Sequence, residues 1–259
     1  SFESFSFPMT NSENSKRIAK NTLVLYVRML FMMLVGLYTS RVVLDALGEA
    51  NYGIYNVVGG VVPMLSVLTS ALSGAISRFI TFELGTGNQE RLSRIFSTSV
   101  NIQFLMALAA FVLCEVIGVW FLNEKMNIPS DRMEAAHFVL QCSIASFMVS
   151  LVSVPYNAVI VAHERMSAFA YIGIVETILK LMIAYLVSVS PIDTLKLYAF
   201  LLLVISLIMR FIYGIYCRRH FAEAQYHFLI DRSLLKQMFG FAGWNLFGNV
   251  TYVFSTQGV

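Results

Sequence analysis

The sequence predicts an all-α membrane protein, a polytopic bundle of transmembrane helices. Of its 259 residues, 58% are apolar and only 13% are charged, and the mean hydropathy is +0.71. Soluble domains carry about 25% charged residues. The apolar residues also run in blocks of about 20, the length that a helix needs to cross a bilayer. This composition excludes an ordinary soluble domain, because a water-soluble core could not bury so much apolar surface.

Six apolar blocks are long enough for complete transmembrane helices, and a seventh begins near Phe239 and continues to Val259. The six predicted spans cover residues 22–44, 54–77, 97–122, 135–161, 169–190 and 195–216. Polar turns separate them, in order, at 48–51, 85–94, 123–134, 163–167 and 191–193. Pro63, which follows Gly59 and Gly60, and Pro155 predict bends in the second and fourth spans, because proline removes a helical hydrogen bond.

These blocks divide the chain into four parts. Residues 1–15 form a polar N-terminal segment, 16–216 a six-helix N-terminal lobe, 217–238 a cytoplasmic linker, and 239–259 the first helix of a second lobe. We interpret Met9 as the natural start and residues 1–8 as upstream sequence that is not native, because they have neither the basic region nor the apolar core of a signal peptide. We expect the second lobe to continue beyond Val259.

The distribution of lysine and arginine predicts a cytoplasmic N-terminus, because cationic loops are disfavoured on the translocated side. With that orientation, eleven of these residues lie inside and four lie outside. The inside set is Lys16, Arg17, Lys20, Arg78, Arg91, Arg94, Arg165, Arg218, Arg219, Arg232 and Lys236. The outside set is Arg41, Lys125, Arg132 and Lys196. The loops at 123–134 and 190–195 are therefore predicted to lie outside.

Five charged residues fall in the interior of predicted spans, at least six residues from either end: Arg28, Glu115, Glu176, Lys180 and Arg210. A charge at mid-bilayer costs about 2.5–3.5 kcal/mol, so these side chains should face other helices or water. Glu176 and Lys180 are four residues apart on one helix face and predict an internal ion pair. Arg28 and Arg210 have no acid at that spacing. They either pair with Glu115 or Glu176 on another helix, or they line a water-filled cavity.

Two stripes of small polar residues each follow one helix face. The first comprises Ser66, Ser70, Ser73 and Ser77, and the second comprises Ser143, Ser146, Ser150, Ser153 and Asn157. Such stripes permit close helix packing, and they can also form the wall of a hydrophilic cavity. In the second interpretation the candidate substrate-binding residues are Arg28, Arg210, Ser70, Ser73, Ser146, Ser150 and Asn157.

The sequence contains no motif for catalysis or for a cofactor. It has neither a GxxxxGK[ST] phosphate loop nor a GxGxxG dinucleotide loop. His163-Glu164 lacks the second histidine of HExxH, and Cys114, Cys142 and Cys217 are isolated, so no metal site is predicted. A net charge of +3 without a basic cluster argues against nucleic acid as a partner. We therefore expect a protein that is not an enzyme and uses no cofactor.

Four segments resemble bacterial polysaccharide flippases, a family within the multidrug/oligosaccharidyl-lipid/polysaccharide exporter superfamily. Leu47–Tyr55 (LGEANYGIY) resembles the entry to their second helix, and Leu84–Asn88 (LGTGN) their cytoplasmic loop between helices two and three. Pro155–Ala158 (PYNA) and His163–Met166 (HERM) resemble their fourth helix and the turn after it. The resemblance extends from about Asn14 to Val259.

The resemblance implies an inner-membrane protein with two six-helix lobes around a cavity, which flips an undecaprenyl-pyrophosphate-linked oligosaccharide for lipopolysaccharide or capsule synthesis. Arg28 lies where such flippases carry an arginine that meets the pyrophosphate. The implied partners are the lipid-linked oligosaccharide, the bilayer, a polysaccharide polymerase and glycosyltransferases. This chain alone, with one lobe, is not expected to transport. The alternatives are a cation-coupled multidrug exporter of the same fold, whose first helix would carry an acid, and a half-transporter or structural membrane protein.

Overall fold

The structure is a computed structural model that describes residues 11–60, 66–126, 128–227, 231, 234–238, 240 and 243. Its helices are α1 (Asn11–Gly60), α2 (Ser66–Thr86), α3 (Gln89–Glu124), α4 (Met133–Ala162), α5 (Met166–Ser188) and α6 (Thr194–His220), followed by the 3-10 turn η2 (Ala222–Ala224). Within these ranges the chain contains helices and no strand, which confirms the predicted all-α class.

Five helices, α1 and α3 to α6, are long and apolar enough to cross a membrane, so the chain is a multi-pass membrane protein. They cover the first and the third to sixth predicted spans. Residues 61–65 of the second predicted span, 54–77, lie outside the described residues. The bend predicted at Pro63 therefore also lies outside them. The predictions for residues 1–8 and for the seventh helix also fall almost wholly outside the described ranges.

Glycines make two of the changes of direction between helices. Gly48 has φ 75° and ψ 162° inside α1, a conformation that glycine adopts at little cost, and divides the helix into two segments. The helix resumes at once, so the polar turn predicted at 48–51 is reduced to this one residue. Gly87, with φ 72°, follows α2, and the Asn88 side chain then caps α3 by accepting a hydrogen bond from the Arg91 N–H at 3.0 Å.

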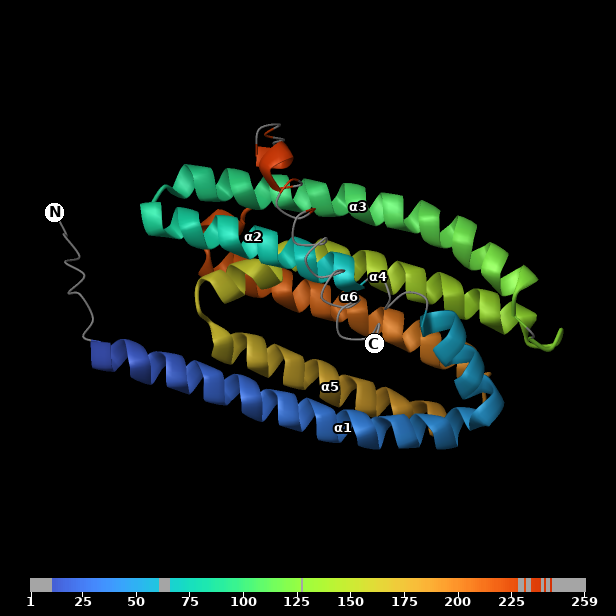
Figure 1. The fold of residues 1–259 in the computed structure, drawn as a ribbon. Coiled ribbons are helices and arrows are strands. Elements are labelled where there is room, and N and C mark those ends of the chain that lie inside the picture. Colours follow the sequence, from blue (N-terminus) through green and yellow to red (C-terminus); the bar gives the residue numbers. More distant parts are fainter. Residues whose placement is uncertain are drawn as a thin grey trace, which may run out of the picture.

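The helices pack as a layered bundle with α4 and α6 in its middle (Figure 1). α1 and α5 lie side by side along one side, and α2 and α3 lie along the other. α4 contacts α2, α3 and α6 extensively, and its buried side chains supply much of the core. The first segment of α1 packs mainly on α5, and much of its remaining surface is exposed and apolar, as contact with lipid or another helix requires.

Two ion pairs join the turns at one end of the bundle. Arg132 Nη1 lies 3.1 Å from Asp193 Oδ2, and Lys196 Nζ lies 2.6 Å from Glu134 Oε1. The predicted outer loops at 123–134 and 190–195 therefore share one end, as an alternating up-and-down path through the membrane demands. Which side of the membrane this end faces stays a prediction from the cation count.

Candidate functional site

Arg28 lies in the contact between α1 and α5, where a glycine makes room for it. Its guanidinium carbon is 4.2 Å from the centroid of the Phe169 ring, a cation–π distance. A Cβ atom added to Gly173 would lie 2.7 Å from both Nε and Nη2 of Arg28. No side chain larger than glycine fits there unless the guanidinium moves. Gly173 and Phe169, one helical turn apart on α5, thus form the seat of this cation.

The carboxylates predicted as partners for Arg28 are engaged elsewhere. Glu176 accepts from Lys180 Nζ at 2.6 Å, which is the predicted ion pair. Glu115 on α3 accepts from Gln141 Nε2 at 3.0 Å. Arg28 Nε is buried, and among the described residues it has no hydrogen-bond partner. In the described part of the chain, the pairing alternative is therefore not realised for Arg28, and its charge remains available to an anion.

Three helices contribute polar groups around this position. Tyr213, buried on α6, lies within electrostatic range of both Arg28 on α1 and Glu176 on α5. Because Lys180 already neutralises Glu176, the cluster of Arg28, Glu176 and Lys180 keeps one net positive charge. Such a cluster favours an anionic ligand over a cationic one.

The serine stripes are placed beside helix contacts. On the α4 stripe, Ser143 Oγ lies 3.5 Å from the position of a Cβ on Gly59, so this face meets the second segment of α1 at close range. Ser153 donates to the backbone carbonyl of Val149 at 2.7 Å. Asn157 has a buried Oδ1 without a partner among the described residues.

The other predicted cavity residues are less uniform in their exposure. Ser73 and Ser146 are half-buried and Ser150 is exposed, while the side chain of Ser70 lies outside the described residues. No hydrogen bond between described residues joins either stripe to Arg28. The role of the stripes as a cavity wall therefore stays a prediction.

Arg210 occupies a different pocket from the α1–α5 contact. Its guanidinium carbon lies 3.9 Å from the centroid of Tyr156 on α4, and its Nη1 is 2.9 Å from the position of a Cβ on Gly214. It lines a pocket of about 440 Å³ together with Arg218. The two arginines predicted to share one cavity thus have separate surroundings.

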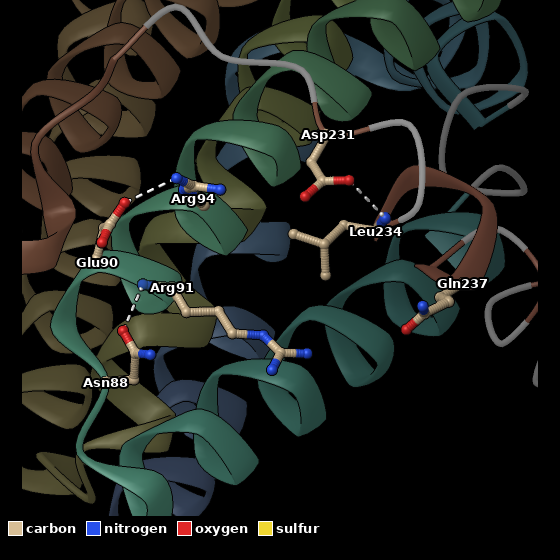
Figure 2. Close-up of a pocket in the computed structure, with 7 residues that line it drawn as sticks. All are labelled: Asn88, Glu90, Arg91, Arg94, Asp231, Leu234 and Gln237. Carbon is tan, nitrogen blue, oxygen red and sulfur yellow. Dashed lines mark hydrogen bonds and ion pairs between the residues drawn. The ribbon is translucent and has the colours of Figure 1, made fainter.

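A further pocket, of about 300 Å³, lies between the start of α3 and the side chains of Asp231, Leu234 and Gln237 (Figure 2). Its cations are neutralised: Arg94 Nη2 is 2.7 Å from Glu90 Oε1, and Arg91 Nε is 3.3 Å from the buried Glu83. Asp231 accepts from the Leu234 N–H at 3.2 Å, at the start of the helical residues 234–238. With both of its arginines paired, this pocket has the character of a contact between segments.

A hydrogen bond between His163 and the buried Glu223, which the sequence did not indicate, links the turn after α4 to the segment after α6. His163, in the turn after α4, is hydrogen bonded through Nε2 to Glu223 Oε1, and the Glu223 side chain is 3% exposed. The His163 ring also stacks on Phe221 with centroids 4.2 Å apart. In the sequence His163 belongs to an incomplete HExxH and to the HERM turn, neither of which indicates this contact, and Glu223 stands in a stretch that gives no sign of burial.

Among the described residues, no three His, Cys, Asp or Glu side chains gather as metal ligands would. The cysteines Cys114, Cys142 and Cys217 are free and buried.

Comparisons of the chain with family models, with curated proteins and with solved structures gave no match.

Proposed function

We propose that this bundle is part of a flippase that moves an undecaprenyl-pyrophosphate-linked oligosaccharide across the bacterial cytoplasmic membrane. The observation that carries the proposal is Arg28, a membrane-embedded arginine whose buried Nε–H has no partner among the described residues. The family resemblance of the four sequence segments supports the choice of substrate.

The chemistry of the substrate explains why a transporter would keep such a residue. An unpaired cation inside a membrane is costly, so its retention calls for a compensating ligand. A pyrophosphate supplies several anionic oxygens, and a guanidinium meets them in a planar, bidentate geometry while staying charged when desolvated. The lipid tail of the substrate can remain in the bilayer, so the protein has to accommodate only the polar headgroup. Hydroxyls of the serine stripes would then meet the sugars.

One observation favours the alternative of cation-coupled transport. Glu115 lies within a membrane-spanning helix, and its Oε1 is buried without a partner among the described residues. A carboxylate in this setting can bind a proton or a metal cation during transport. It stands on α3, however, whereas cation-coupled exporters of this fold would carry their acid on the first helix, which here has Arg28 in its interior. The two functions predict that transport depends on different residues, on Arg28 in a flippase and on Glu115 in a cation-coupled exporter.

The deciding experiment is complementation of a flippase-deficient strain by the full-length gene that includes this chain, with surface polysaccharide as the readout. Loss of charge-assisted hydrogen bonds worth about 1.5–3 kcal/mol should reduce transport about 10- to 100-fold in Arg28→Ala. The transport activity of Arg28→Lys should lie between those of wild type and Arg28→Ala, because lysine keeps the charge but cannot make the bidentate contact of a guanidinium. Arg41→Ala, on the exposed outer part of α1, is the matched control and should transport normally.

All variants have to be compared at equal amounts in the membrane. Wild-type output from Arg28→Ala would remove Arg28 from the mechanism and with it the proposal. Normal output from Arg28→Ala together with loss in Glu115→Gln would favour the cation-coupled alternative.

A further inference from the structure

A second cationic pocket, apart from Arg28, lies near the end of α6. It encloses about 440 Å³, and its polar lining includes Arg210, Arg218, Gln225 and His227. Phe211 and Ile215 add apolar side chains that are 66% and 53% exposed at the surface of the bundle. The pocket thus combines cationic groups with an exposed apolar helix face.

The positive charge of this pocket is not balanced by its own lining. No carboxylate lines it within the part of the chain that the structure describes. The nearest acid in the sequence, Glu223, is buried and bonded to His163. The pocket of Figure 2 offers a contrast within the same molecule, because both of its arginines pair with glutamates. The α6 pocket therefore has an excess of positive charge that a bound anion would balance.

Arg210 is directed toward the end of α6. Side chains on a helix ordinarily lean toward its N-terminus. Arg210 Nη1 instead lies beside Gly214, one turn further on and about 6 Å along the axis. The absence of a Cβ at Gly214 permits this course, since that atom would be 2.9 Å from Nη1. The guanidinium is thereby brought closer to Arg218.

The opposite wall of the pocket is held in place by the rest of the bundle. The Tyr226 hydroxyl donates to Asn101 Oδ1 at 2.7 Å, and the His227 N–H donates to Ser97 Oγ at 3.1 Å. Both acceptors belong to α3. The Tyr156 ring, over which Arg210 lies, is itself fixed by edge-to-face contact with Phe96 at 5.1 Å. The site is therefore preformed, which lowers the entropic cost of binding a ligand.

We propose that this pocket binds the phosphate group of an anionic phospholipid. The helix α6 has 27 residues and a length of about 40 Å, so a hydrocarbon core of about 30 Å would end close to Arg218. Arg218 then lies at the depth of lipid headgroups. Arg210 lies deeper in the membrane, and its side chain extends toward the level of Arg218. The exposed Phe211 and Ile215 lie where an acyl chain would run. Basic pockets at this depth suit anionic headgroups.

Titration of the purified 259-residue chain with lipids, followed by native mass spectrometry, tests this proposal. The probes are phosphatidylglycerol, phosphatidylcholine and inorganic phosphate. We expect phosphatidylglycerol to bind more tightly than phosphatidylcholine, and inorganic phosphate not to displace it. Arg210→Gln and Arg218→Gln should each weaken phosphatidylglycerol binding about five-fold, the effect of removing one basic group near the membrane surface.

Two further variants separate this pocket from general surface charge. Arg219→Gln removes an equal charge from the neighbouring position, outside the pocket lining, and should bind as wild type. Gly214→Ala keeps every charge but displaces the Arg210 guanidinium, so it should weaken binding even if Arg210→Gln folds poorly. An equal loss in Arg219→Gln, equal affinity for the two lipids, or displacement by inorganic phosphate would each overturn the proposal.

Discussion

Replacing Gly173 by alanine probes the seat of Arg28 without touching the cation itself. The added Cβ would lie 2.7 Å from Nε and Nη2, and ordinary contact begins at 3.4 Å. The guanidinium would therefore have to retreat by about 0.7 Å, the difference between these two distances. Since Gly173 is buried and Phe169 lies across the guanidinium, the side chain has to turn away from α5.

The stability cost of this change should be small. Alanine is favoured over glycine inside a helix by about 1 kcal/mol, whereas an extra methyl group in a packed contact costs about 1–3 kcal/mol. The two effects largely cancel, so the free energy of unfolding should change by about 2 kcal/mol or less. Transport should be affected more strongly than stability. A displaced Arg28 guanidinium loses charge-assisted hydrogen bonds to the substrate, so we expect the surface polysaccharide to fall about ten-fold or more.

The assay is complementation, with thermal unfolding of the purified variant alongside it. Gly36→Ala is the matched control, because a Cβ at that membrane-embedded glycine of α1 would meet nothing within 4 Å. A double-mutant cycle supplies the sharper test. If Gly173 acts through Arg28, then Gly173→Ala should cost nothing further in an Arg28→Ala background. Additive losses in the double mutant would refute the reasoning, and so would normal transport by Gly173→Ala.

Two other predictions follow from the structure. A cysteine introduced at Ser130 should react with a membrane-impermeant maleimide in intact cells, whereas one at Glu164 should react only after permeabilisation. The reverse pattern would invert the predicted orientation, and the buried native cysteines keep the background low. His163→Phe should destabilise the purified chain by about 3–5 kcal/mol, because it leaves the buried Glu223 carboxylate without its partner. Glu223→Gln should cost clearly less by the same thermal unfolding assay, and equal losses would contradict a buried charge pair.

Hydropathy predicted the class and five of the helices because the bilayer sets both the length and the composition of a span. The ion pair of Glu176 with Lys180 was predictable for a related reason, since residues four apart meet on one helix face whatever the tertiary structure. The turn at Gly48 was harder to predict from the sequence. The sequence LGEAN has the polar composition of a loop, yet a single glycine with positive φ makes the turn and the helix continues.

Contacts between distant segments could not be predicted in this way. Nothing in the local pattern of Glu223 distinguishes it from the other polar residues of its stretch, and its burial depends on where the turn after α4 comes to lie. The partners of Glu115 were likewise unknowable, because Gln141 stands on another helix with no fixed spacing from it. A charged residue in a predicted span shows that a partner is needed, but not which one.

Arg28 and Arg210, which form no ion pair among the described residues, have the same kind of surroundings. Each guanidinium lies over an aromatic ring and beside a glycine, Phe169 with Gly173 for Arg28 and Tyr156 with Gly214 for Arg210. The ring stabilises the charge without neutralising it, and the glycine lets the flat group lie against the helix. For Arg210 half of this arrangement is visible in the sequence, as a glycine four residues further on. For Arg28 the glycine is on another helix, and only the packing of α1 on α5 brings the two together. Because a cation–π contact leaves the donor edges of the guanidinium free, both arginines can still bind an anion, which an ion pair would have prevented.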